Sequence, residues 1–193
     1  MTSPILEVEK VFKSFGGLTA LANIDITVTE GEIIGLIGPN GSGKTTLLNL
    51  ITGALRCDRG TIRFRGKDIT RVSRERRCVE GINRTFQSSR PFPKMTVLQN
   101  VMVARCYGRN PARSRRAAAL ESEILIDFMG LREKKDIPAH NLGSAESKRL
   151  ELGRALAANP TLLLLDEPMA GLSQGEISSI IDLFLIDGSL RLV

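Results

Sequence analysis

The sequence predicts an α/β fold, because it contains two kinds of strand pattern separated by segments with helical spacing. Three segments alternate polar and apolar residues as half-buried strands do, namely 7–11, 24–28 and 61–66. Two others, 32–38 (EIIGLIG) and 161–166 (TLLLLD), are continuous apolar runs. Such runs are typical of strands that are covered on both faces in a parallel sheet.

Helical spacing accounts for much of the remaining chain. Residues 44–55 (KTTLLNLITGAL) have this spacing and reach Gly53 near their end. Residues 96–130 are helical in spacing but polar, with a break at 108–114 (GRNPARS). We therefore expect a helical insertion between sheet elements there. A further helix is expected to follow LGSAE (142–146) and to end near Pro160.

Length and composition favour one domain. The chain has 193 residues, of which 42% are hydrophobic, so it can bury a sizeable core. We expect a single domain over 1–193 with a helical subdomain at about residues 90–150. No run approaches 18 apolar residues, and the first ten residues carry charges where a signal peptide needs an apolar core. The sequence therefore predicts a cytoplasmic chain.

The three cysteines give no sign of a metal cluster or a disulfide framework. Cys57, Cys78 and Cys106 are widely spaced, and their number is odd. We expect them to be reduced, which agrees with a cytoplasmic location.

The net charge of +6 comes with two arginine-rich clusters, RVSRERR (71–77) and RNPARSRR (109–116). Such clusters bind nucleic acid or an anionic membrane, or they are simply solvated helical faces. We favour the solvated face. Neither cluster contains an interleaved aromatic residue, which argues against binding to single-stranded nucleic acid.

The strongest motif is GPNGSGKTT, between an expected strand and an expected helix. It matches G-x-x-x-x-G-K-[ST], the phosphate-binding loop of P-loop NTPases. Glycines let successive backbone N–H groups face one point, and the helix directs its positive end at that point. We expect Lys44 to reach the β- and γ-phosphates, Thr45 to ligate Mg²⁺ and Thr46 to support the α-phosphate. The nucleotide-binding residues are then Gly38, Pro39, Asn40, Gly41, Ser42, Gly43, Lys44, Thr45 and Thr46.

The second motif is LLLLDEP, in which an apolar strand delivers two carboxylates to its end. Doubly wound sheets place ligands at the carboxyl ends of their strands. Asp166 is suited to hold Mg²⁺ through water, and Glu167 to act as general base toward the attacking water. A carboxylate pair that merely caps a strand is the weaker alternative, because a phosphate loop lies upstream.

Further features occur in a characteristic order around these two motifs. EVEKVFKSFGGLTAL precedes the loop, RTFQSSRPFP and LGSAESKRLELGRAL follow it, and MAGLS comes after the DE strand. Over about residues 5–175 the chain resembles the ATP-binding subunits of ABC transporters. FGGLTALANI and RTFQSSRPFPKMTVLQNV resemble, in particular, the subunits of branched-chain amino acid importers and their amide or urea relatives.

The resemblance implies an α/β P-loop NTPase fold with a mainly parallel central sheet, an N-terminal antiparallel β part and a helical insertion. It implies that Phe15 stacks on adenine, and that Gln87 contacts Mg²⁺ and the water. Taken alone, Phe15 reads as a core or turn aromatic and Gln87 as a polar strand end. Asp166 matches the carboxylate that holds Mg²⁺ through water, and Glu167 matches the catalytic carboxylate. MAGLS matches the loop that couples the two nucleotide sites. Residues 142–146 match the signature that clamps the partner subunit's γ-phosphate, in which Gly143, Ser144 and Ala145 are the implied binding residues.

The sequence departs from the family pattern at two places that affect ATP hydrolysis. Ala145 and Glu146 stand where a glycine and a glutamine are usual, so we expect a weakened clamp, with Ser144 as the helix N-cap. The histidine that contacts the γ-phosphate has no counterpart after Glu167. His140, the single histidine, is expected on a surface loop. We expect an altered or truncated C-terminus. The crowded apolar residues at 180–186 are expected to pack against a neighbouring chain or to make the protein prone to self-association.

These features predict an ATP-binding subunit of an importer that hydrolyses ATP to drive uptake of branched-chain amino acids or related small solutes. The alternative is an ATP-binding but hydrolysis-deficient remnant, and we expect turnover by this chain to be near background. The implied cofactors are ATP and Mg²⁺. The implied partners are a second ATP-binding subunit, identical or paired, transmembrane permease subunits and, indirectly, a periplasmic or extracellular solute-binding protein, with no nucleic acid. The expected location is the cytoplasmic face of the membrane.

Overall fold

The computed structural model describes residues 3–85, 91–166 and 174–175. These residues form two compact units, which we call the N-terminal unit (described residues 3–77) and the C-terminal unit (78–85, 91–166 and 174–175). The chain passes from the first unit to the second within α2 (Arg74–Glu80). Each unit is described by itself.

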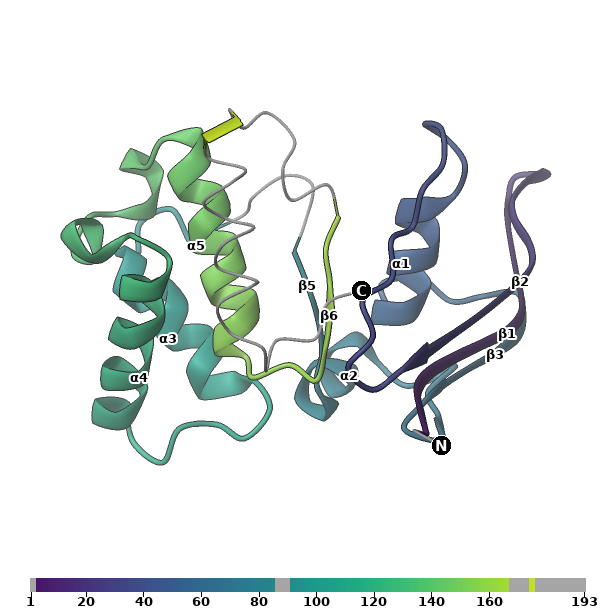
Figure 1. Ribbon diagram of the computed structural model, residues 1–193, viewed down its shortest axis with the longest axis horizontal. Helices are drawn as coiled ribbons and strands as arrows, with labels where there is room; N and C mark the ends of the chain where they lie inside the picture. Colours follow the sequence, from purple (N-terminus) through teal and green to yellow (C-terminus); the bar gives the residue numbers. More distant parts are fainter. Residues whose placement is uncertain (1–2, 86–90, 167–173, 176–193) are drawn as a thin grey trace. The chain divides into compact units, whose positions relative to one another are not determined.

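An antiparallel sheet forms most of the N-terminal unit (Figure 1). Its strands lie in the order β2-β1-β3-β4, with bounds β1 (Pro4–Phe15), β2 (Leu18–Thr29), β3 (Arg59–Phe64) and β4 (Lys67–Asp68). β1 lies between β2 and β3, so that Leu6 faces Val28 on one side and Phe64 on the other. All three of these side chains are buried. The expected N-terminal antiparallel part is confirmed, and its strands extend beyond the segments that alternate.

The helix α1 (Lys44–Thr52) follows the phosphate loop, as predicted. It buries Leu47, Leu48, Leu50 and Ile51, and Gly53 ends it with a left-handed backbone at φ 77°. The left-handed C-cap favours glycine, because a side chain there meets the preceding carbonyl. The helix is shorter than the 44–55 segment for this reason.

The buried side chain of Arg77 connects the carboxyl end of α1 with residues 69–72, which follow β4. It is only 2% exposed. Its Nη1 donates to the carbonyls of Leu50 (2.6 Å) and Ile51 (2.8 Å), and its Nη2 and Nε donate to carbonyls at 69, 70 and 72. Burial lowers the pKa of its guanidinium. The last carbonyls of a helix have no N–H donor within the helix. Arg77 donates to two of these carbonyls in α1.

The expected strand at 32–38 is wrong for the structure described here. Residues 32–38 form no strand, and Ile33, Leu36 and Ile37 are exposed, Ile37 to 95%. A strand requires a ladder partner. The parallel pair among the described residues lies in the C-terminal unit, and the four strands of the N-terminal unit pair with one another. The apolar run therefore suits a strand in composition, but the described strands of its own unit offer it no partner.

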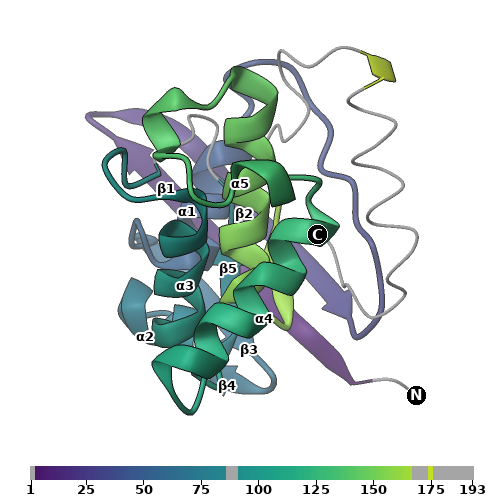
Figure 2. The same ribbon diagram turned by 90° about the vertical axis from the view of Figure 1, so that its left-hand side faces the viewer.

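Helices and one parallel strand pair make up the C-terminal unit (Figures 1 and 2). The pair is β5 (Ile82–Arg84) and β6 (Leu162–Leu164), with Ile82 opposite Leu162 and Arg84 opposite Leu164. The helices α3 (Val97–Tyr107), α4 (Arg115–Phe128) and α5 (Ser144–Ala157) pack on one another, and the short 3₁₀ helices η1 (Arg132–Lys134) and η2 (Ala139–Asn141) connect α4 to α5. The predicted helical segment with a break is confirmed.

Local sequence explains where these helices begin. Thr96 caps α3 in a capping box with Gln99, and the Ser114 hydroxyl accepts the N–H of Ala117 at the start of α4. No helix in the described part of the chain combines the length and the apolar character needed to cross a bilayer.

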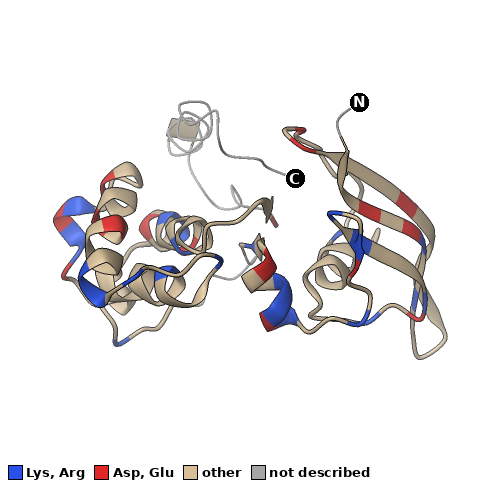
Figure 3. Cartoon of the chain, turned by 90° about the horizontal axis from the view of Figure 1, so that it is seen from below, with Lys and Arg blue, Asp and Glu red and all other residues tan. Residues whose placement is uncertain are grey.

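The arginine-rich clusters are mainly solvent-exposed but not entirely so. Arg74 and Arg76 are exposed, as are Arg113, Arg115 and Arg116. Figure 3 shows Lys and Arg distributed over both units and interspersed with Asp and Glu. Arg77 is the exception that the solvated-face interpretation missed, because it points into the core of its unit.

Candidate functional site

The phosphate loop lies at the head of α1 in the N-terminal unit. Ser42 N–H donates to the Pro39 carbonyl (3.2 Å), which closes a turn, and the helix begins at Lys44. The Lys44 ammonium donates to the carbonyls of Gly38 (2.6 Å) and Pro39 (2.9 Å). The first turn of a helix presents N–H groups that the helix itself does not use. The loop thus places a charged ammonium beside a helix N-terminus, which is the arrangement that binds a phosphate.

Gly43 is the position in this loop that tolerates no side chain. Its φ is +91°, in the left-handed region. A Cβ built on it would lie 2.7 Å from the carbonyl oxygen of Ala20 and 2.7 Å from Leu21 Cδ2, so that β2 blocks the space. Gly41 is also left-handed, at φ +82°. The motif requires a glycine at Gly43 because the loop lies closely against β2 there, and it favours one at Gly41 because the backbone is left-handed.

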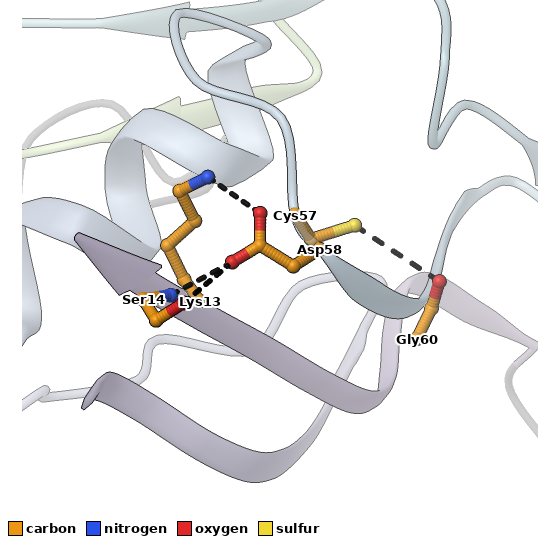
Figure 4. A network of polar contacts seen from close by, with 5 residues as sticks. All are labelled: Lys13, Ser14, Cys57, Asp58 and Gly60. Carbon is orange, nitrogen blue, oxygen red and sulfur yellow. Dashed lines mark hydrogen bonds and ion pairs between the residues drawn. The ribbon is translucent and has the colours of Figure 1, made fainter. Parts of the chain in front are cut away.

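Phe15 ends β1 beside a network centred on Asp58 (Figure 4). The Asp58 carboxylate accepts from Lys13 Nζ (2.7 Å) and Ser14 N–H (2.8 Å). These contacts, the lysine first, lower the pKa of Asp58. Phe15 itself is 45% exposed, with Lys13 Nζ 5.3 Å from its ring centre. Sequence reasoning missed Asp58, which fixes the strand end that carries Phe15 and lies 43 positions downstream of it.

Asp166 lies directly beyond the parallel pair in the C-terminal unit, at the carboxyl end of β6 as predicted. It is 6% exposed. Its Oδ2 lies 2.5 Å from Nη2 of Arg84, and its N–H donates to the Thr85 hydroxyl (3.3 Å). Arg84 and Thr85 belong to the RTFQ motif, but no pattern in the sequence connects them with Asp166.

The signature segment opens α5. Gly143 is the N-cap, with extended backbone at φ −67° and ψ 171°. Ser144 is the first helical residue, so the prediction that it is the N-cap is wrong by one position. The physical reason is Glu146: from the third helical position its Oε2 accepts the Gly143 N–H (3.0 Å), the reciprocal bond of a capping box, which sets Gly143 as the N-cap.

The second carboxylate oxygen of Glu146 pairs with Lys134 of η1. The contact with Lys134, followed by that with the Gly143 N–H, lowers the pKa of Glu146. Its negative charge is therefore matched by a cation and by the positive end of α5. The expectation that Ala145 and Glu146 weaken the clamp stays a prediction.

Several predicted residues lie outside the described part of the chain. These are Gln87, Glu167, the coupling segment 169–173 and the apolar segment 180–186. His140 lies in η2, where it is exposed and its Nδ1 is 2.7 Å from the Pro93 carbonyl oxygen. Its predicted place at the surface is confirmed.

Comparison with known proteins identifies the family. The family described as ABC transporter matches residues 21–170. The chain is 38% identical to a probable branched-chain amino acid transport ATP-binding protein LivG of Methanocaldococcus jannaschii, over 90% of this chain and 72% of that protein. It is 34% identical to the high-affinity LivG protein of Escherichia coli K12, over 95% of this chain and 76% of that protein.

A solved structure agrees with this match. The ADP conformation of MJ1267, an ATP-binding cassette of an ABC transporter, superposes with a TM-score of 0.84 at 34% identity. The alignment covers 97% of this chain and 78% of that one. The predicted P-loop NTPase fold is thereby confirmed. The chain belongs to the ABC transporter family, as an ATP-binding subunit homologous to the LivG proteins.

Proposed function

We propose that the chain binds MgATP and hydrolyses it to drive import of branched-chain amino acids or related small solutes. The observation that carries this proposal is the phosphate loop, in which Gly41 and Gly43 curl the backbone and Lys44 heads α1. The names of the LivG relatives support the class of solute.

The donor types of the candidate metal residues fit Mg²⁺. Thr45 offers a hydroxyl, Gln87 an amide oxygen and Asp166 a buried carboxylate. Mg²⁺ is held by few protein oxygens together with phosphate oxygens and water, which matches this set. When bound, the ion neutralises charge on the phosphates.

The remaining chemistry falls to side chains of the chain itself. Lys44 would exchange its two carbonyl contacts for phosphate oxygens, and the first turn of α1 would hold the same phosphates. Phe15 would stack on adenine from the end of β1. Glu167 would accept a proton from the attacking water.

The chain would act in a complex with other subunits. A second ATP-binding subunit would receive the signature residues Gly143, Ser144 and Ala145 at its γ-phosphate, and permease subunits in the membrane would carry the solute. The chain would therefore act at the cytoplasmic face of the membrane, with a solute-binding protein as an indirect partner.

Uptake of labelled leucine tests the proposal in cells. The chain is expressed in an Escherichia coli strain that lacks its own LivG, beside the variant Lys44→Ala. Uptake with the parent and none with the variant would support import, whereas no uptake with either would favour the hydrolysis-deficient alternative. Phosphate release by the purified chain, with Glu167→Gln as control, separates a working ATPase from a subunit that binds ATP without hydrolysing it. Failure of the parent to bind MgATP would refute the proposal.

A further inference from the structure

A buried ion pair ties the strand β5 to the carboxylate that follows β6. Arg84 is the last residue of β5, and its Nη2 lies 2.5 Å from Oδ2 of Asp166. The two side chains are 4% and 6% exposed. They are 82 positions apart in the sequence, so the pair exists only because the two strands are neighbours.

The backbone fixes both members of the pair. Arg84 lies opposite Leu164 in the parallel ladder, and the Thr85 N–H donates to the Leu164 carbonyl (3.0 Å). The Asp166 N–H donates in turn to the Thr85 hydroxyl (3.3 Å). Arg84 and Asp166 therefore meet through the register of β5 and β6.

The pair compensates the negative charge that Asp166 carries when no metal ion is bound. A buried carboxylate is costly unless a cation accompanies it. In the proposed function Mg²⁺ and nucleotide arrive together, so between turnovers Asp166 needs another cation. The guanidinium of Arg84 fills this role, because its planar fork donates to a carboxylate in a fixed geometry.

We propose that Arg84 is a positioning residue that serves as the resident counter-charge of Asp166 and thereby makes metal binding depend on nucleotide. Because Arg84 already neutralises the carboxylate, a free divalent cation gains little by approaching it. The phosphates of the nucleotide supply the additional negative charge, and the metal then binds with them. This inference rests on the proposed function, because it takes Asp166 as a metal residue.

Mn²⁺ binding, followed by the electron paramagnetic resonance signal of the free ion, tests the inference without turnover. The parent is titrated alone and with ADP, and the neutral variants Arg84→Met and Arg84→Gln are titrated alone. We expect the parent to bind Mn²⁺ weakly alone and much more tightly with ADP. The neutral variants should bind Mn²⁺ without nucleotide about tenfold more tightly than the parent does, because one repelling charge is gone.

Two further variants serve as controls. Arg84→Lys keeps the charge and should bind Mn²⁺ as the parent does. Arg132→Met removes an arginine from an exposed pair with Asp127, 3.2 Å apart, and should change nothing. Melting gives an independent readout: Arg84→Met should melt lower than the parent, and the double variant Arg84→Met/Asp166→Asn should recover part of that loss.

The outcomes separate the inference from the function on which it rests. If the parent binds no Mn²⁺ with ADP, the proposed function fails, and the inference fails with it. If the parent binds Mn²⁺ with ADP but a folded neutral variant binds it no more tightly than the parent without nucleotide, the inference alone is overturned. Two neutral variants are used so that one misfolded protein does not decide the result.

Discussion

Replacing Glu146 by glutamine or by alanine separates the two contacts that its carboxylate makes at the start of α5. Glutamine keeps an oxygen for the Gly143 N–H but loses the ion pair with Lys134, whereas alanine loses both. The Lys134 side chain is 40% exposed, so the pair contributes only about 0.5 kcal/mol. The charge at the helix start contributes about 0.5 kcal/mol more, and the cap about 1 kcal/mol.

We therefore expect Glu146→Gln to lower the free energy of unfolding by about 1 kcal/mol and Glu146→Ala by about 2 kcal/mol. For a chain of this size these losses correspond to roughly 2–4 °C of melting temperature per kcal/mol. The assay is urea unfolding followed by circular dichroism, repeated across pH.

The pH dependence has a definite sign. Lys134 and the Gly143 N–H hold the pKa of Glu146 below its ordinary value of 4.5. A carboxyl with a depressed folded-state pKa stabilises the fold above its unfolded pKa, and that stability is lost as pH falls through the folded pKa. The difference between the parent and Glu146→Gln should thus be constant from pH 7 to about 5 and shrink below it. A glutamine variant that is more stable than the parent at pH 7, or a difference that persists unchanged in acid, would refute this reasoning.

Two other variants test the parts of the N-terminal unit that hold the phosphate loop. Arg77→Met removes the donors to five backbone carbonyls and should cost about 3 kcal/mol in urea unfolding, with no rescue by Arg77→Lys, whose ammonium lacks the planar fork. A cost below about 1 kcal/mol would contradict that role. Gly43→Ala places a Cβ 2.7 Å from the Ala20 carbonyl oxygen at a positive φ. It should abolish stabilisation by MgATP in a melting assay, and a normal response to MgATP would show that the loop tolerates a side chain.

The antiparallel strands, the helix after the phosphate loop and the divided helical segment could be predicted from the sequence, because each depends on local pattern. That residues 32–38 form no strand could not be predicted, because an apolar run shows that a segment suits a strand but not whether a partner strand is available to it. The N-cap lies at Gly143 and not at Ser144, because the Glu146 carboxylate accepts the N–H of the residue three positions before it.

Long-range contacts explain the rest of what the sequence left open. In the sequence, Arg77 is one charge of a cluster that suits a solvated helix face. In the folded chain it caps the carboxyl end of α1, a helix that begins 33 positions earlier at Lys44. Arg84 and Asp58 carried no motif that indicated their partners. Their roles depend on strand register and turn geometry, which residue spacing does not encode.

The central claim is that the phosphate loop binds MgATP, and the melting temperature measured with and without MgATP tests it most directly. Ligand at about 100 times its dissociation constant stabilises a folded protein by about 2.7 kcal/mol, which corresponds to a rise of roughly 5–10 °C here. Lys44→Ala removes a charge-assisted contact and should lose most of that rise. We predict a clear shift for the parent and little for Lys44→Ala. The claim would be contradicted by a parent whose melting temperature MgATP leaves unchanged, or by an equal rise in both proteins.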